Sequence, residues 1–417
     1  MLQYERFPNK QGQGKTMSRR ERALGPLDRR RALQGLALSL IALALPAQAE
    51  DFAQFLQNIW PQAQAAGVSR ATFEAAVFGL APEPGVLAKP KAQAEFTISI
   101  PAYLAGAVTS SRVARGQSVA AELAGPLRRA TARHGVPGEI IVAILGVESN
   151  FGTATGGADV LKVLATLAWK GHRAETFIEE FVAALVMLEK GYATRAQLRG
   201  SWAGAMGQPQ FMPSAYLKYA ESDDGAGAPD IWRSHADAVA SIARFLAKSG
   251  WVAGLPAVVE VRLPDGFDYA AFDLDFGRCR SLGVQRADGE ALPSSGAASL
   301  YLPAGANGPA FLISDNFEVI RQYNTSDAYA MSVAILADRI AGRETPLTPW
   351  PRVAPLSTGD VKAMQQLLTE KGYYRGAIDG KLGRTSRNAV HAFQIAEGIQ
   401  PADGFATKEI LTRLKGR

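Results

Sequence analysis

The sequence predicts a mostly helical α+β protein, with a small β-containing subdomain and a separate small domain of three helices at the C-terminus. Three observations support this. Apolar residues recur at helical spacing between about 50 and 250, short β-branched runs replace them from about 257 to 313, and four prolines interrupt residues 345–357. A length of 417 residues suits two or three domains.

The periodicity places the main elements along the chain. Helices are expected over 52–59, 117–134, 138–149, 174–190, 236–249 and 326–341. Pro137 suits the first turn of the helix over 138–149, and Gly152 suits its exit. Short strands are expected at 257–263, 299–303 and 311–313.

The proline-rich run marks a domain boundary. It predicts an extended linker over 346–357, because proline lacks the N–H that a helix needs. Three short amphipathic helices are expected in the domain that follows, at 358–417. Two turns there resemble each other, Asp379-Gly380 before Thr385 and Asp403-Gly404 before Thr407, and turn and cap chemistry alone can explain this echo.

Residues 1–49 have the pattern of a cleaved signal peptide. Arg29, Arg30 and Arg31 precede an apolar run over 36–45, and Ala47-Gln48-Ala49 fits the rule for the cleavage site. We therefore expect a periplasmic protein with no membrane span after processing; an uncleaved amphipathic anchor is the alternative. No cysteine lies near the cleavage site, which argues against a lipid anchor, and the paired arginines leave the Sec and twin-arginine routes both open.

Composition excludes several classes of function. The net charge of +6 comes from the leader, which holds nine Lys and Arg against three Asp and Glu, so 36 of each sign remain and nucleic-acid binding is not expected. The four histidines are far apart and Cys279 is the single cysteine, so no metal site is indicated. No cofactor is expected, since the one phosphate-loop-like run, at 12–16, lacks its first glycine.

The segment GVESNFG at 146–152 carries the strongest chemical signal. Glu148 ends an apolar helix on the same side as Ile141, Ile144 and Leu145. Apolar burial and the negative end of the helix dipole both favour the protonated carboxyl, as a general acid requires. The segment SWAGAMGQPQFMPSAY at 201–216 is rich in glycine and amides, which suits the lining of a polymer-binding groove.

These two segments, with YNTSDAYAMSVAILADRI at 323–340, resemble the lytic murein transglycosylases of the MltB type. The likeness covers most of 50–342, including the blocks at 95–117 and 162–177, so the catalytic domain is expected at 50–345. Separately, DGKLGRTSRNAVHAFQ at 379–394 and DGFAT at 403–407 make 358–417 similar to the peptidoglycan-binding domain.

The resemblance implies a lysozyme-like fold, with peptidoglycan glycan strands as the partner and a monomeric enzyme. It implies cleavage of the β-1,4 bond between N-acetylmuramic acid and N-acetylglucosamine without water, giving a 1,6-anhydro sugar. One carboxyl group serves first as acid and then as base, whereas ordinary glycosidases use two. A muramidase that uses water and a non-catalytic wall-binding protein remain the alternatives.

The resemblance also assigns residues. It implies that Glu148 is the acid and base, that the Ser201 hydroxyl lies near it, and that Gln210 contacts sugar through its amide. It implies that Tyr323 orients the carboxyl, with Asn324 and Tyr329 on the same block as further substrate-binding candidates.

Some members of the family carry a calcium loop where this chain has SDDGAGAPDIW at 222–232. Ser222 and Ala226 stand where two acidic ligands would be, and Asp224 and Asp237 alone are too few for six to eight oxygens. We therefore expect no bound calcium. We also expect deletion of 346–417 to weaken binding to sacculi and to leave turnover of soluble muropeptides largely intact, because the small domain tethers the enzyme to the polymer.

Overall fold

The computed structural model describes residues 47–88, 99–171, 173–269, 273–352, 354 and 356–416. Residues 1–46 of the predicted signal peptide therefore lie outside the described residues, as do residues 95–98 of the block at 95–117. Among the described residues, no helix is long and apolar enough to cross a membrane. The predicted fold class is confirmed: helices dominate, and two small antiparallel sheets accompany them.

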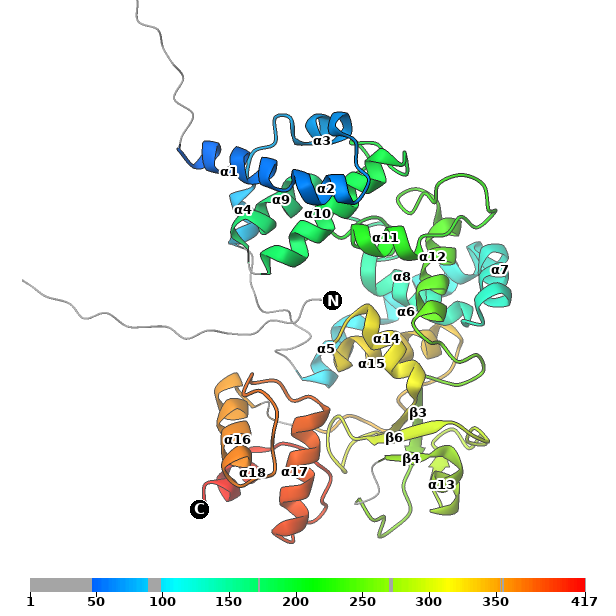
Figure 1. Cartoon of the computed structure of the whole chain (residues 1–417). Coiled ribbons are helices and arrows are strands. Elements are labelled where there is room, and N and C mark those ends of the chain that lie inside the picture. The colour runs from blue at the N-terminus through cyan, green and yellow to red at the C-terminus, as the bar shows by residue number, and fades with distance from the viewer. Residues whose placement is uncertain are drawn as a thin grey trace, which may run out of the picture.

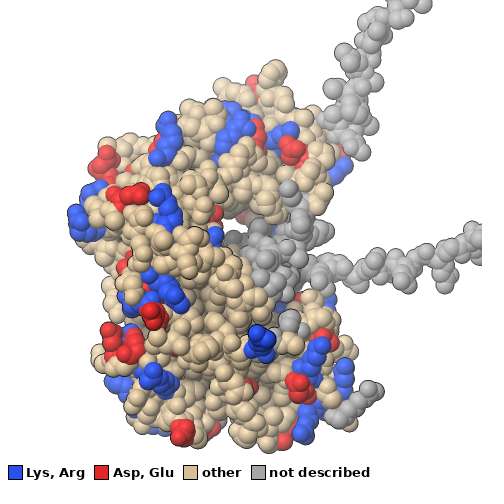
Figure 2. Space-filling model, turned by 180° about the vertical axis from the view of Figure 1, so that it is seen from behind, with Lys and Arg blue, Asp and Glu red and all other residues tan. Residues whose placement is uncertain are grey.

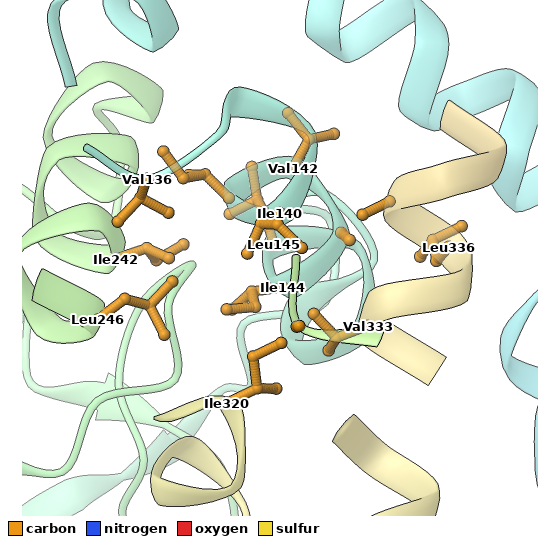
Figure 3. Packing of buried hydrophobic residues seen from close by; sticks show 14 of the residues in the cluster. Val136, Ile140, Val142, Ile144, Leu145, Ile242, Leu246, Ile320, Val333 and Leu336 are labelled. Carbon is orange, nitrogen blue, oxygen red and sulfur yellow. The ribbon is translucent and has the colours of Figure 1, made fainter. Parts of the chain in front are cut away.

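The helix that carries Glu148 lies at the centre of the largest core. Helix α8 (Gly138–Ser149) has six consecutive residues, from Ile140 to Leu145, that are less than a tenth exposed. Figure 3 shows these side chains packed between α12 (His235–Lys248) and α15 (Asp327–Ile340), with Ile320 of α14 (Asp315–Tyr323) below them. Such burial on all sides fixes the direction in which the end of α8 points.

Segments that precede and follow α8 in the sequence form a second helical layer (Figure 1). Helices α9 (Val160–Lys170) and α10 (Ala174–Glu189) pack along each other, and α10 also packs against α11 (Pro213–Tyr219). The N-terminal helices complete this layer: α1 (Ala47–Asn58), α2 (Trp60–Ala65), α3 (Arg70–Val77) and α4 (Pro84–Leu87). Helix α5 (Ile100–Ala107) instead packs against α15.

The single helix expected over 117–134 is wrong. The chain forms α6 (Ser110–Glu122) and α7 (Ala124–His134), which meet at Leu123. Pro126 explains the break, because it has no N–H to donate to the carbonyl of Glu122. Pro137 is the N-cap of α8 rather than a residue of its first turn.

A five-stranded antiparallel sheet forms the β-containing subdomain, in the order β4-β6-β7-β3-β5. Its strands are β3 (Val258–Arg262), β4 (Asp273–Asp275), β5 (Gln285–Arg286), β6 (Ala297–Tyr301) and β7 (Ala310–Ile313). Helix α13 (Phe276–Ser281) covers one face and buries Cys279 completely. Burial raises the pKa of this thiol to about 11, and Cys279 packs as a small apolar residue in the core of the subdomain.

The C-terminal domain contains the three expected helices, α16 (Thr358–Glu370), α17 (Arg384–Ala396) and α18 (Lys408–Leu414). Its two Asp-Gly turns are closed in the same way. Gln365 accepts a bond from Gly380 N at 2.8 Å and donates to Asp379 at 3.0 Å, while Gln394 accepts from Gly404 N at 2.7 Å and donates to Asp403 at 3.0 Å. The echo in the sequence is therefore a repeated structural turn.

Charges of both signs are distributed over the surface. On the face shown in Figure 2, Lys and Arg side chains lie among Asp and Glu side chains, with uncharged surface between the groups. This agrees with the balance of 36 basic and 36 acidic residues after the leader.

Candidate active site

Glu148 occupies the last turn of α8, where the chain reverses sharply. The next residues, Asn150 (φ 49°), Phe151 (φ 58°) and Gly152 (φ 82°), are all left-handed, which is costly for the first two. Ser149 stabilises the turn, since its hydroxyl accepts a bond from Gly152 N at 2.9 Å. Consecutive strained residues beside a half-buried carboxyl are typical of a functional site.

The reversal depends on a close approach at Gly146. A Cβ at this position would lie 2.6 Å from the ring of Phe151, which is buried against the helix. We expect Gly146→Ala to lower the free energy of unfolding by about 1–3 kcal/mol because the ring has no space to move. Thermal unfolding measures this, with Gly106→Ala in α5 as the control, since nothing lies within 4 Å of its added methyl. Equal melting temperatures for the two variants would contradict the packing described here.

Tyr329 is the side chain that holds the carboxyl. Its hydroxyl donates to Glu148 Oε1 at 2.5 Å, and its ring is 2% exposed. Burial first, and then the Glu148 carboxylate, raise the pKa of Tyr329 well above its usual value. The hydroxyl therefore stays protonated at physiological pH and acts as a fixed donor. A ring this deeply buried cannot stack on a sugar, so the structure favours a positioning role for Tyr329 over the expected substrate contact.

Tyr323 has a different partner from the one we expected. Its hydroxyl donates to the Pro209 carbonyl at 2.7 Å, so its single proton is not directed at Glu148. Its ring lies parallel to that of Tyr329, with centroids 6.5 Å apart and planes at 14°. This geometry favours Tyr329 over Tyr323 as the residue that orients the carboxyl. Burial, followed by the charge of Glu148, raises the pKa of Tyr323 as well.

Gln210 joins the amide-rich loop to the loop that follows Glu148. Its side-chain amide donates to Thr155 O at 3.1 Å and to Gly207 O at 2.8 Å, and its backbone is left-handed, with φ 51°. The loops also touch at Gly156 (φ 82°), where a Cβ would lie 2.2 Å from Gly200 O. Because the NH2 group is used in this way, the side-chain oxygen of Gln210 is the atom left to face a sugar.

Ser201 and Asn324 organise turns on either side of these loops. The Ser201 hydroxyl accepts bonds from Ala203 N at 3.3 Å and Ala205 N at 3.1 Å, which leaves its proton for another acceptor. Asn324 lies between α14 and α15, and its side chain accepts a bond from Ser326 N at 3.2 Å. The strands β1 (Ala158–Asp159) and β2 (Arg199–Gly200) pair beside them and fix the two loops relative to each other.

Sequence analysis missed three residues of this arrangement. Thr155 and Pro209 contribute backbone carbonyls, which no side-chain motif can signal. Tyr103 of α5 is close enough to Tyr329 to raise its pKa further, and it lies in the matched block at 95–117. The block itself is the signal that could have identified Tyr103, since it places an aromatic residue on a helix within a segment that resembles the family.

The loop at 222–232 is closed by the chain's own hydrogen bonds. Asp237 accepts from Asp223 N at 3.1 Å and Asp230 N at 2.8 Å, so both of its oxygens are used. Asp224 accepts from the Ser222 hydroxyl at 2.7 Å and Ala226 N at 2.9 Å. Arg129 forms an ion pair with Asp223. The carboxylate oxygens that calcium would need are therefore already bound to hydrogen-bond donors and to a guanidinium. The residues present do not fit the ion.

Comparisons with known proteins identify the family of this chain. The family model described as the transglycosylase SLT domain matches residues 51–338, and the model of a putative peptidoglycan binding domain matches residues 357–414. The chain belongs to the MltB-type lytic transglycosylases that carry a C-terminal peptidoglycan-binding domain, and it has their lysozyme-like fold.

Individual relatives match to different extents. Membrane-bound lytic murein transglycosylase B of Escherichia coli is 36% identical over 221 residues, which are 52% of this chain and 60% of that relative. The crystal structure of SltB3 from Pseudomonas aeruginosa in complex with NAG-anhNAM-pentapeptide matches at 42% identity with a TM-score of 0.80, covering 87% of this chain and 99% of SltB3. The structure of Escherichia coli Slt35 in complex with calcium matches at 29% identity with a TM-score of 0.59, over 71% of this chain and 94% of Slt35.

We expect calcium to leave the stability of this protein unchanged, whereas a loop that binds calcium would be stabilised by the ion. We expect the melting temperature to stay within about 1 °C when calcium or a chelator is added, because each carboxylate already has donors. Asp237→Ala should lower it by several degrees, since two backbone N–H groups lose their acceptor at about 1–3 kcal/mol each. Asp265→Ala, on an exposed turn, is the control. A stabilisation that saturates with calcium would contradict this.

Proposed function

We propose that this chain is a lytic transglycosylase that cleaves the β-1,4 bond between N-acetylmuramic acid and N-acetylglucosamine in peptidoglycan and forms a 1,6-anhydromuramoyl end. Glu148 is the single catalytic carboxyl, acting first as acid and then as base. The observation that carries this proposal is the 2.5 Å bond from the buried Tyr329 hydroxyl to Glu148 Oε1 at the end of α8.

The proton and bond changes balance with one carboxyl group. The protonated Glu148 gives its proton to the glycosidic oxygen as the C1–O bond of the muramoyl sugar breaks. The resulting carboxylate takes the proton of the 6-hydroxyl of the same sugar, whose oxygen then bonds to C1. Glu148 ends protonated, and no water is consumed.

A hydrolase needs a second carboxylate to activate water or to bond the sugar. The charge of Glu148 contributes to the raised pKa of both Tyr323 and Tyr329, so this carboxyl lies beside both buried hydroxyls. The anhydro sugar named in the SltB3 complex supports the same product for a relative that is 42% identical.

The remaining polar groups suit recognition of sugar. We assign the Ser201 hydroxyl, the side-chain oxygen of Gln210 and the amide of Asn324 to the substrate, because each side chain is held by backbone partners. The C-terminal domain would hold the enzyme on the insoluble polymer. A cleaved signal peptide at 1–49 would place the processed, monomeric enzyme in the periplasm.

Product analysis tests this proposal. Purified protein is incubated with sacculi, and the released muropeptides are weighed by mass spectrometry. We expect anhydromuramoyl products, which are lighter by one water than the products of a hydrolase. Reducing sugar ends at the full hydrolytic mass would show that the chain is a muramidase.

A further inference from the structure

The C-terminal domain is fixed to the catalytic domain, and the linker before it is also held. Glu260 of β3 accepts bonds from Leu347 N at 2.6 Å and Thr348 N at 2.8 Å, although its side chain is buried. Farther along, Asp403 accepts a bond from Ala306 N at 2.9 Å. These bonds hold the first part of the linker against the sheet, so it is not a free spacer.

Helix α17 makes the central contact between the domains. In Figure 1 it is the helix of the C-terminal domain drawn next to β6, and its Arg384 donates to the Ser299 hydroxyl at 3.0 Å. One turn further, Arg387 extends into the catalytic domain. Its guanidinium lies 4.6 Å from the ring centre of Tyr301 and 3.0 Å from Asp327 Oδ2, with the side chain 18% exposed.

Three side chains contact the carboxylate of Asp327. Arg387 and the Tyr301 hydroxyl, at 3.3 Å, contact Oδ2, and Arg321 lies 2.9 Å from Oδ1. The carboxylate is 16% exposed, so removal of one cation leaves a half-buried charge that is under-compensated. The least costly response is movement of Asp327 toward water.

Asp327 and the tyrosine that holds Glu148 belong to the same helical turn. Asp327 is the first residue of α15, and Tyr329 follows two positions later. The N-cap Ser326 accepts a bond from Tyr329 N at 3.4 Å, which joins the two ends of this turn. A displacement of Asp327 therefore moves the Tyr329 hydroxyl relative to Glu148.

We propose that Arg387 is a positioning residue for the reaction: the C-terminal domain braces the first turn of α15 through Asp327 and so keeps Tyr329 in place on Glu148. This inference rests on the proposed function. It also reverses the expectation for a simple tether, since the domain is needed for turnover of soluble muropeptides as well as for binding to sacculi.

Kinetics on soluble muropeptides test the proposal in the full-length protein. We expect Arg387→Ala to lower kcat about tenfold, with KM unchanged within about twofold, because the geometry of the acid changes and the sugar contacts do not. Arg413→Ala, an exposed arginine on α18, is the matched control and should leave both constants unchanged. A kcat equal to wild type for Arg387→Ala, with only sacculus binding weakened, would show that the domain is a tether.

Two further measurements separate positioning from a general loss of structure. If Arg387→Ala does not fold, Arg387→Lys keeps the charge without the planar fork, and we expect its kcat to lie between the wild-type value and about a tenth of it. In a double-mutant cycle, Asp327→Asn and Arg387→Ala should together lower kcat no more than the stronger single change. Effects that multiply would overturn a shared path through Asp327.

Hydrogen exchange gives a readout that does not depend on activity. The amides of 327–332 should exchange faster in Arg387→Ala than in Arg413→Ala, while those of α8 stay protected. Unchanged exchange at 327–332 would overturn the brace even if the enzyme makes the proposed product. Conversely, faster exchange with a hydrolytic product from wild type would refute the proposed function and retain the brace.

Discussion

Glu148→Gln is expected to lower the rate of glycan cleavage at least about 1,000-fold, near the upper part of the range for loss of a general acid. The amide keeps the shape of the side chain and can still meet the Tyr329 hydroxyl, but it cannot give a proton to the glycosidic oxygen or take one from the 6-hydroxyl. Release of soluble muropeptides from sacculi, followed over time, measures the effect.

A matched control is available on the same helix. Glu139→Gln changes a carboxylate in the first turn of α8, where Glu139 lies 3.6 Å from Arg343 and far from the reversal after Ser149. We expect it to retain activity within about twofold, since a surface ion pair contributes little. Binding of Glu148→Gln to sacculi should equal that of wild type. Comparable loss of activity in both variants would mean that α8, rather than the Glu148 carboxyl, is what matters.

Tyr329→Phe is expected to have the second-largest effect. It removes a single hydroxyl whose bond to Glu148 Oε1 is 2.5 Å long. A hydrogen bond to a charged group contributes about 1.5–3 kcal/mol, which corresponds to roughly a 10- to 100-fold fall in kcat if the bond fixes the catalytic carboxyl. The KM for soluble muropeptides should change little, because the buried ring does not touch the sugar.

Tyr374→Phe gives the comparison that this variant needs. Tyr374 is also buried and donates its hydroxyl to a carbonyl, that of Ala377 at 2.8 Å, but it lies in the C-terminal domain. Both variants should lose similar stability, and only Tyr329→Phe should lose turnover. If Tyr323→Phe proved the more damaging change to kcat, the assignment of the orienting role to Tyr329 would be wrong.

The position of Glu148 could be predicted because it depends on local sequence. An apolar run from Ile140 to Leu145 with a polar exit has one stable arrangement, a buried helix that ends where the chain turns. The distinction between Tyr323 and Tyr329 could not be predicted. Both belong to one matched block, and the direction of each hydroxyl follows from the turn at Asn324, which sequence periodicity does not describe.

The contact between the domains was equally hidden. Arg387 lies in a polar stretch of α17 that resembles a solvated helix face, and its partners Tyr301 and Asp327 are distant in sequence. A proline-rich run suggests a free linker, because nothing in its sequence reveals that Glu260 binds its backbone. Pairing between residues that are distant in sequence depends on tertiary packing, which the propensities of single residues do not describe.

Digestion of sacculi in heavy-oxygen water tests the central claim most directly. If the 6-hydroxyl of the sugar is the nucleophile and Glu148 alone carries the proton, the muramoyl ends released by wild type will contain no oxygen from the solvent. Incorporation of one heavy oxygen into each newly formed muramoyl end would contradict the account.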